Sequence, residues 1–490
     1  MKVLQVQNIR YGKIVNGVDF DWHQGEIIAL MGANGSGKST LAHLLAGLIE
    51  PEGGQIRLAL DGTVCDWNTV KRWQEIGLVG QHPRRQTIGA TVAEELGFGL
   101  MNLGMTSHAV QNRVRELAIS VGLGGKEDQS PATLSGGERQ RLVTAAILAL
   151  QPAFLILDEA LTMLDTRAQA KVLELLFQAR TETGQLWITH DWELASQANR
   201  LLIIQNGKLA DLGKPSDVFA NREKCALYGL GEVYAKPISL TPKYLQIKDV
   251  VGLARPKAVL RRPVLEWKQT NYVSRLQLDK VVRAGEFIGI VGPSGSGKTT
   301  LLESVIGLIL PNEGQLMVGG VQVSKVSLNT LRRKIRLVLQ EAGEYLIGRS
   351  VYHEIFYSDS RQELKIKTQE KLAVLEEFGL SVSLAEVAPE RLSGGERQKI
   401  ALAAALRTAP EILLLDEPLI GLDATSRAGI QTIISAWNDI TILYVTHDLR
   451  EVLQDADRIW LVESGNVILD CSIQCWQEHQ EQFRAAGVRC

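Results

Sequence analysis

The feature that most constrains the fold of this chain is a glycine-rich segment that occurs twice. Gly32–Thr40 follows the pattern G-x-x-x-x-G-K-[ST], and Gly292–Thr300 repeats it in the second half. The apolar run Ile27–Met31 precedes the first copy and an Ala/Leu-rich segment follows it, which predicts a buried strand, a tight loop and a helix. Such a loop wraps a phosphate group, because successive N–H groups at the start of the helix point at the anion. The residues predicted to bind phosphate are Gly32, Ala33, Asn34, Gly35, Ser36, Gly37, Lys38, Ser39 and Thr40, and Gly292, Pro293, Ser294, Gly295, Ser296, Gly297, Lys298, Thr299 and Thr300.

The composition favours a globular chain without a membrane span of its own. With 490 residues, 45% of them hydrophobic, the chain is long enough for two or three domains, and its net charge of −2 gives no basic field for nucleic acid. Five scattered cysteines, an odd number, favour a reducing compartment without disulfides. The most apolar region, Ala145–Leu164, is interrupted by Asp158 and Glu159, and the N-terminus lacks the apolar core of a signal peptide. We therefore expect a cytoplasmic protein that reaches a membrane only through partners.

A second motif, Leu-Ser-Gly-Gly-Glu-Arg-Gln, occurs identically at Leu134–Gln140 and Leu392–Gln398, before a predicted helix in each case. Ser-Gly-Gly at a helix start offers free N–H groups and a hydroxyl to an anion. A cap with only a structural role needs just one of these residues, so seven identities favour a binding role. The candidate binding residues are Ser135, Gly136, Gly137, Glu138, Ser393, Gly394, Gly395 and Glu396.

Polar residues end three predicted strands in each half. The apolar runs Phe154–Leu157 and Ile412–Leu415 suit parallel strands that are buried on both faces, and α/β sheets hold their ligands at the carboxyl ends of such strands. The alternative, that these carboxylates only cap the next helix, does not account for a phosphate loop in each half. The strand-end candidates are Asp158, Glu159, Gln81 and His190, matched by Asp416, Glu417, Gln340 and His447.

The order of these motifs resembles that of an ABC-type ATPase domain, and the resemblance covers nearly the whole chain twice. It implies an α/β fold with two P-loop NTPase nucleotide-binding domains in tandem. Each would have a RecA-like parallel-sheet core, an antiparallel β part and a helical subdomain that carries the Ser-Gly-Gly motif. We expect a first domain at residues 1–230, a proline-containing linker at 231–262 and a second domain at 263–490.

The resemblance also implies ATP and Mg²⁺ as cofactors and two composite sites, in which each ATP lies between one domain's phosphate loop and the other domain's Ser-Gly-Gly motif. Glu159 and Glu417 would orient the attacking water as bases, and His190 and His447 would hydrogen-bond the γ-phosphate. The ring of Tyr11 would stack on the base. The implied metal-site residues are Ser39, Gln81, Asp158, Thr299, Gln340 and Asp416.

The sequence departs from the family pattern at two places. Ala160 stands where the second half has Pro418, the usual residue, and Asn271 aligns with Tyr11, although the adjacent Tyr272 could supply the ring. Neither change removes a catalytic group, so we expect two competent sites. Outside the family motifs, Cys471, Cys475 and His479 are spaced as one helical face, which matches no closed zinc pattern.

The segment after Gln81 is similar to that of the ATPase subunits of energy-coupling-factor (ECF) importers, including the cobalt type. The similarity rests on Gln86–Glu95, Phe98–Gly99 and Asn102–Met105, and Ile347–Val351 in the second half aligns with Ile88–Val92. It implies a fused pair that grips a transmembrane coupling protein, beside a membrane-embedded substrate-binding subunit, with no nucleic acid partner. We expect residues 82–95 and 341–354 to line two grooves that hold helices of this coupling protein. The first groove would offer Arg84, Arg85 and Gln86, and the second would offer Glu341, Glu344 and Tyr345.

Other tandem ABC proteins remain alternatives. Those that act on ribosomes carry a long charged helical insert, and sugar-importer ATPases often lose consensus residues at one site. DNA-repair members need cysteine-rich zinc insertions. None of these features is seen in the sequence. The solute is left open among a vitamin, a vitamin precursor such as the thiamine-precursor hydroxymethylpyrimidine, and a metal ion.

Overall fold

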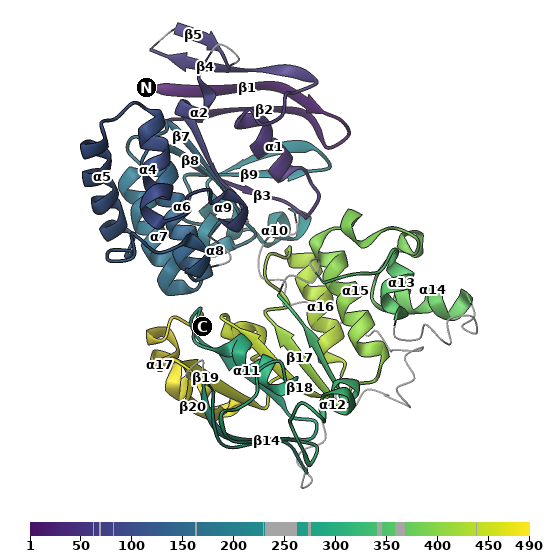
Figure 1. Cartoon of the computed structure of the whole chain (residues 1–490). Coiled ribbons are helices and arrows are strands. Elements are labelled where there is room, and N and C mark those ends of the chain that lie inside the picture. Colours follow the sequence, from purple (N-terminus) through teal and green to yellow (C-terminus); the bar gives the residue numbers. More distant parts are fainter. Residues whose placement is uncertain are drawn as a thin grey trace. The chain divides into compact units, whose positions relative to one another are not determined.

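The chain forms two compact units, one mainly from each half (Figure 1). The computed structural model describes residues 1–490 except 62, 68–69, 82, 162–163, 229, 231–261, 273–275, 341–344, 358–367 and 438. The predicted linker, apart from Arg262, lies outside the described residues, as do Glu341 and Glu344.

The first unit contains an antiparallel sheet and a mainly parallel sheet. The antiparallel sheet has the order β2-β1-β4-β5, and every second residue of β2 is buried from Val18 to Trp22, as a sheet with one covered face requires. The second sheet has the order β10-β9-β3-β8-β7-β6, and only β10 runs antiparallel to its neighbour. The strands are β1 (Lys2–Tyr11), β2 (Val15–His23), β3 (Ile27–Met31), β4 (Gly53–Leu60), β5 (Thr63–Asp66), β6 (Ile76–Val79), β7 (Phe154–Asp158), β8 (Gly184–Ile188), β9 (Arg200–Gln205) and β10 (Lys208–Gly213).

One core of the first unit joins the two sheets, and a separate one fills the helical part. In the first, Trp22 of β2 packs on Phe154 of β7 with ring centroids 4.8 Å apart. The helical core is built from buried faces of α4, α5 and α6, which lie side by side in Figure 1. The helices are α1 (Lys38–Leu45), α2 (Arg72–Glu75), α3 (Pro83–Gln86), α4 (Val92–Asn102), α5 (Ser107–Ser120), α6 (Gly136–Leu148), α7 (Thr166–Ala179), α8 (Trp192–Ala195), α9 (Pro215–Phe219) and α10 (Arg222–Tyr228), with the 3-10 helix η2 (Pro131–Thr133).

The second unit repeats this plan, with its strands joined into one sheet of order β15-β14-β11-β12-β20-β19-β13-β18-β17-β16. A parallel pair, Gln277 with Asn466, connects the antiparallel strands to the rest. The strands are β11 (Pro263–Asn271), β12 (Gln277–Arg283), β13 (Phe287–Val291), β14 (Glu313–Val318), β15 (Val321–Gln322), β16 (Ile335–Val338), β17 (Ile412–Asp416), β18 (Thr441–Thr446), β19 (Arg458–Glu463) and β20 (Asn466–Ser472).

The helices of the second unit follow the same order along the chain. They are α11 (Lys298–Val305), α12 (Leu328–Lys334), α13 (Val351–Ile355), α14 (Thr368–Glu377), α15 (Gly394–Arg407), α16 (Ala424–Ser435) and α17 (Gln480–Ala485), with the 3-10 helices η6 (Val382–Leu384), η7 (Pro389–Arg391), η8 (Leu449–Glu451) and η9 (Ile473–His479). Both units thus have the predicted α/β fold. In the part of the chain that the structure describes, no helix is both long and apolar enough to cross a bilayer.

Candidate functional site

A tight loop between β3 and α1 forms the predicted phosphate-binding segment of the first unit. A side chain at Gly32 would collide with the carbonyl oxygen of Ile204 on β9, so only glycine fits there. Gly37, just before α1, has a φ of 106°, which residues with a side chain rarely adopt. The first N–H groups of α1 have no partner inside the helix, so they are available to an anion bound at the loop.

In both units the side chain of the loop lysine turns back onto the backbone of the phosphate loop. Lys38 Nζ donates hydrogen bonds to the carbonyl oxygens of Gly32 and Ala33 at 2.9 Å each, and Lys298 makes the matching two bonds at 2.8 Å each. Both lysines are buried, and burial lowers the pKa of Lys38. A buried ammonium group beside the free N–H groups is suited to an anion.

The loops also hold buried hydroxyl groups that lack partners. Ser36 Oγ and Ser296 Oγ are buried, and neither has a hydrogen-bond partner among the described residues. Because buried polar atoms are normally satisfied, a hydroxyl left over at this position in both units favours a ligand with oxygen acceptors. Both loops therefore fit a phosphate group.

The hydroxyl that follows each lysine is hydrogen-bonded to a strand-end carboxylate. Thr299 Oγ1 donates to Asp416 Oδ2 at 2.8 Å, and Ser39 is bonded to Asp158 in the same way. Burial raises the pKa of both carboxyl groups, that of Asp416 to about 6. Hydroxyl and carboxylate oxygens beside a phosphate site are ligands that Mg²⁺ takes, so these residues fit a magnesium site.

The next carboxylates, Glu159 and Glu417, have an unusual backbone. Their φ angles are 53° and 46°, in the left-handed region, which costs about 1–3 kcal/mol for a residue with a side chain. The main-chain N–H of each glutamate nevertheless donates a hydrogen bond to the neighbouring strand. Glu159 donates to the carbonyl oxygen of Ile188 at 3.0 Å, and Glu417 donates to that of Val445 at 2.9 Å. The fold therefore stabilises a strained conformation at the same position twice, which is typical of functional sites.

In the first unit, Glu159 lies among three polar side chains. Gln81 Nε2 donates to Glu159 Oε2 at 3.2 Å, and His190 Nε2 lies 3.1 Å from Glu159 Oε1. The same imidazole nitrogen lies 3.0 Å from Asn34 Oδ1. The structure thus brings together residues from the ends of β6, β7 and β8 and from the phosphate loop. The motif predicted that Asn34 belongs to that loop, but its contact with His190 was not predicted.

In the second unit, His447 Nδ1 lies 2.9 Å from Glu417 Oε2. Burial would raise the pKa of Glu417, but the positive charges of His447 and Lys298 outweigh it and lower this pKa. Burial would lower the pKa of His447, but nearby carboxylates, chiefly Glu417, outweigh it and raise this pKa. Gln340 is exposed after β16 and makes no hydrogen bond among the described residues, unlike Gln81.

The Ser-Gly-Gly motif begins a helix in each unit. Ser135 and Glu138 form a reciprocal capping box at the start of α6, as Ser393 and Glu396 do at α15. Burial opposes ionisation of Glu138, but hydrogen bonds from Lys126 and Ser135 lower its pKa to about 2. A Cβ built on the first glycine of either motif would meet nothing within 4 Å, so the backbone of this glycine faces open space.

A glutamate locks the turn that follows Gln81 and its repeat. Glu95 Oε2 accepts hydrogen bonds from the N–H groups of Ile88 and Gly89 at 2.8 and 2.7 Å. In the second unit Glu354 Oε2 accepts from Ile347 and Gly348 at 2.8 and 2.5 Å. The alignment of Ile347–Val351 with Ile88–Val92 therefore corresponds to the same local structure.

Two expectations are wrong. Tyr272 is 2% exposed in the core beside β11, so its ring is not available to stack on a base. Tyr11, at the end of β1, is half-buried. Cys471 lies in strand β20, whereas Cys475 and His479 lie on η9, so the three do not share a helical face. No cluster of metal-ligand side chains was found among the described residues.

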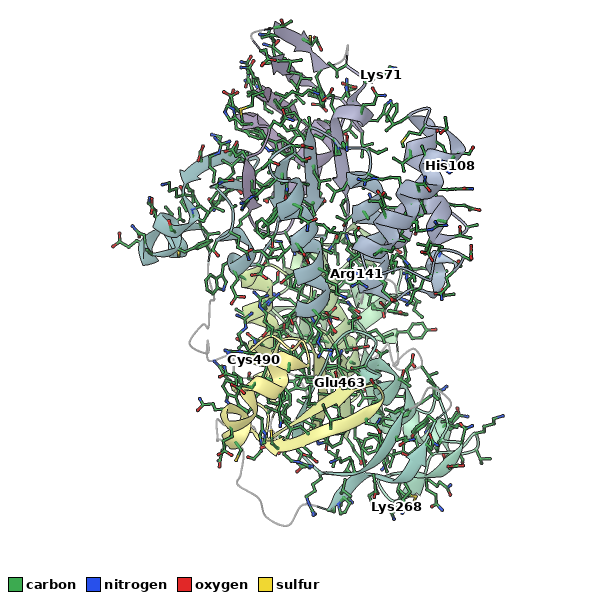
Figure 2. All side chains as sticks on the ribbon, turned by 90° about the vertical axis from the view of Figure 1, so that its left-hand side faces the viewer. Lys71, His108, Arg141, Lys268, Glu463 and Cys490 are labelled. Atoms are coloured by element: carbon green, nitrogen blue, oxygen red, sulfur yellow. The ribbon has the colours of Figure 1, made fainter. Side chains whose placement is uncertain are left out.

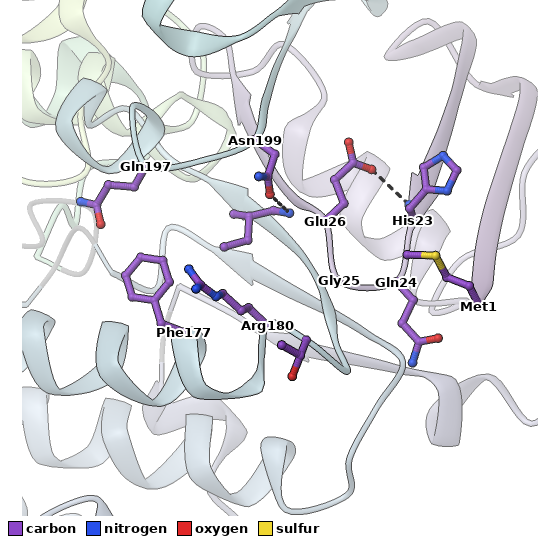
Figure 3. Close-up of a pocket in the computed structure, with 11 residues that line it drawn as sticks. Met1, His23, Gln24, Gly25, Glu26, Phe177, Arg180, Gln197 and Asn199 are labelled. Atoms are coloured by element: carbon purple, nitrogen blue, oxygen red, sulfur yellow. Dashed lines mark hydrogen bonds between the residues drawn. The ribbon is translucent and has the colours of Figure 1, made fainter.

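A pocket of about 530 Å³ in the first unit lies away from these residues (Figure 3). It is lined by His23, Glu26, Arg180 and Asn199, among others, and Asn199 Oδ1 accepts the N–H of Ile27, the first residue of β3. The phosphate loop follows the last residue of β3. The pocket therefore lies at the end of β3 opposite to the phosphate loop and is not part of the candidate site.

The fold and the two sets of residues define a tandem P-loop ATPase. The family model described as ABC transporter matches residues 15–162 and 276–420, more than half of the chain, and the chain belongs to this family. Its relatives are ATP-binding proteins of transporters, and the ABC ATPase domains of this family bind ATP, generally with Mg²⁺.

Two relatives and one solved structure illustrate the similarity. The chain is 30% identical to the peptidoglycan transport ATP-binding protein YejF of Agrobacterium fabrum, over 93% of this chain and 88% of the relative. It is 29% identical to an ABC transporter ATP-binding protein (BL0043) of Bifidobacterium longum, over 91% of this chain but only 62% of that relative. The structure of archaeal ribosome recycling factor aABCE1 with ribosomal stalk protein aP1 aligns with a TM-score of 0.62, 21% identity, and 98% and 92% coverage of the two chains, which supports the fold.

Proposed function

We propose that this chain is the energy-coupling ATPase of an ECF-type importer, a fused pair of ATPase domains that acts at the cytoplasmic face of a membrane through partner subunits. The observation that carries the proposal is the turn after Gln81, which Glu95 locks and which Glu354 reproduces in the second unit. The ECF resemblance rests on this segment. A vitamin, a vitamin precursor or a metal ion would be the solute.

The proposed division of the chain is a first ATPase domain at residues 1–230, a linker at 231–262 and a second domain at 263–490. Each ATP would lie between the phosphate loop of one domain and the Ser-Gly-Gly motif of the other. The open space beside the first glycine of each motif agrees with such a role, because a helix start with free N–H groups needs room for the γ-phosphate.

Each proposed role follows from the contacts within one unit. Lys38 and Lys298 would leave their loop carbonyls and bind the β- and γ-phosphates, while Ser36 and Ser296 donate to phosphate oxygens. Ser39 with Asp158, and Thr299 with Asp416, would hold Mg²⁺, which supplies positive charge that neutralises the phosphates. Glu159 and Glu417 would accept a hydrogen bond from the attacking water, and His190 and His447 would donate one to the γ-phosphate.

The proposed contact with the transmembrane partner surrounds the locked turn. Several large apolar side chains are exposed here: Ile88 is 63% exposed, and Phe98 and Met101 on α4 are 49% and 54% exposed. In the second unit Ile347, which aligns with Ile88, is 67% exposed, and Tyr345, two residues before it, is 55% exposed. Apolar side chains gathered around a rigid turn suit a partner helix laid across them.

Reversing the charges of Arg84 and Arg85 should detach the membrane partner without affecting basal hydrolysis. Both arginines are exposed on α3, and we expect them to pair with an acidic or carbonyl-rich helix end. The variant R84E/R85E and a control, K208E/K214E, carry the same charge change at exposed sites of the first unit. The measurements are recovery of membrane subunits with the tagged protein, identified by mass spectrometry, and ATP hydrolysis by the isolated protein.

We expect several-fold lower recovery of membrane subunits for R84E/R85E and unchanged recovery for the control. Equal recovery in all three proteins would contradict the placement of the interface. Loss of ATP binding in R84E/R85E would mean that the segment serves the nucleotide instead. Recovery of ribosomal proteins in place of membrane subunits would overturn the importer proposal in favour of a role on ribosomes.

A further inference from the structure

The residues after His447 are joined to the C-terminal segment, Gln480–Cys490, by main-chain hydrogen bonds. The Arg489 N–H donates to the carbonyl oxygen of His447 at 2.9 Å, and the Leu449 N–H donates to the carbonyl oxygen of Arg489 at 2.8 Å. Together they form a parallel β-bridge between Asp448 and Arg489. The backbone of the candidate catalytic histidine is therefore held by a residue far along the chain.

The C-terminal segment is itself fixed in the core of the second unit. Phe483 on α17 is completely buried, and Val488 is 1% exposed, in the same apolar cluster as Tyr444 of β18 and Leu449. The Val488 N–H is bonded to the carbonyl oxygen of Phe483 at 3.0 Å, which closes the turn after α17. Figure 2 labels Cys490, which follows the bridge and is half-buried. The bridge thus belongs to a packed segment, so it can hold the backbone of His447 in a fixed position.

Polar contacts hold the same segment from within the unit. Glu451 is partly buried and accepts hydrogen bonds from Tyr444 Oη at 3.0 Å and Thr446 Oγ1 at 2.9 Å. The same Thr446 hydroxyl accepts the N–H of Asp448 at 3.0 Å. His447 is thus flanked on both sides by anchored residues while its ring lies against Glu417. Among the described residues, the bond from Arg489 is the hydrogen bond outside the regular strands that reaches the main chain of His447 itself.

The first unit places its histidine differently. Asp191 caps α8 there, and the indole of Trp192 packs edge-on against Phe219 of α9, with ring centroids 6.3 Å apart. Leu194 stands four residues after His190, where the second unit has Glu451. In the described part of the first unit, no β-bridge joins the residues after His190 to another segment. Among the described residues, an isolated bridge of this kind is therefore found beside His447 and not beside His190.

We propose that Arg489, through its main chain, is a positioning residue for His447, and that the C-terminal segment sets the geometry of the second hydrolytic site alone. The inference rests on the proposed function, because the position of His447 matters for turnover only if that site hydrolyses ATP. The imidazole reaches a γ-phosphate only from a fixed backbone position, and small displacements of a reacting geometry reduce rates strongly. The two sites consequently differ in the contacts that position their histidines, although their motifs match.

The test compares two substitutions at one residue. R489P removes the N–H that bonds to His447, because proline has no amide hydrogen, whereas R489A keeps both main-chain bonds and removes only the side chain. The measurements are kcat and KM for ATP hydrolysis in the full chain, and amide hydrogen exchange over residues 444–452 and the matched residues 187–195. Melting temperature reports whether each variant is folded.

We expect R489P to lower kcat by about tenfold with KM little changed, and to speed exchange in 444–452 but not in 187–195. R489A should retain kcat and exchange. Wild-type kcat and exchange in R489P would overturn the proposal, as would equal loss in R489A. If R489P does not fold, removal of the residues after Val488 deletes the same bonds and is judged by the same outcomes. Exchange needs no turnover, so faster exchange with unchanged kcat would contradict the role of His447 in hydrolysis and leave the anchor itself established.

Discussion

Replacing both Glu159 and Glu417 by Gln is expected to lower ATP hydrolysis by about 100-fold or more, while ATP binding stays intact. The carboxylate acts on the attacking water and not on the nucleotide, and Gln keeps the shape but cannot serve as a base. Both glutamates have the same strained backbone and each lies about 3 Å from a histidine, 3.1 Å in the first unit and 2.9 Å in the second. Phosphate release measures turnover, and equilibrium binding of a fluorescent ATP analogue measures affinity.

The matched control is E116Q/E478Q, which makes the same chemical change at two exposed glutamates, one in each unit. It should hydrolyse ATP at the wild-type rate. Turnover near the wild-type rate in E159Q/E417Q would contradict the assignment of these residues as bases. Loss of ATP binding in E159Q/E417Q would mean that the carboxylates hold the nucleotide.

Lys38→Ala and Lys298→Ala should each reduce hydrolysis by about 100-fold, because each removes a positive charge from the position where the γ-phosphate develops negative charge. Each ammonium group is buried and makes two hydrogen bonds to the carbonyl oxygens of its own loop. Affinity for ATP should fall as well, since the ground-state phosphates lose the same contact. Steady-state kinetics of each single variant provide the measurement.

Lys208→Ala in the first unit and Lys268→Ala in the second serve as controls, because both side chains are exposed on strands and belong to neither loop. If one loop substitution had no effect on turnover, that site would not contribute to hydrolysis, and the proposal of two competent sites would be wrong. Since each single variant keeps the other site intact, a loss of more than half of the activity requires that the two sites act together.

The sequence predicted the residues of the candidate site where a motif ties side-chain type to backbone geometry. The glycine pattern required a loop that no side chain could fill, and the structure has Gly32 against a strand carbonyl and Gly37 in the left-handed region. The apolar runs that end in Asp158 and Asp416 predicted central buried strands, because only fully covered strands are apolar on both faces. The roles of these residues in catalysis remain predictions.

Local spacing failed where it could not distinguish a helix from other elements. Cys471, Cys475 and His479 have helical spacing. Cys471 nevertheless belongs to β20, because this strand pairs with β19 over its whole length. Tyr272 was considered for base stacking because it is adjacent to Asn271. In the fold its ring points into the core of the unit, since neighbouring residues at a strand end face opposite sides.

The sequence by itself determined the α/β fold, the repetition and the identity of the loop, strand-end and helix-start residues, because each of these depends on a pattern within a few residues. Only the tertiary structure decided which of them meet. The contacts of His190 with Asn34 and of His447 with Arg489 join residues far apart in the chain, and their geometry follows from strand order and packing. Two halves with the same motifs therefore hold their histidines by different means, a difference that no local pattern records.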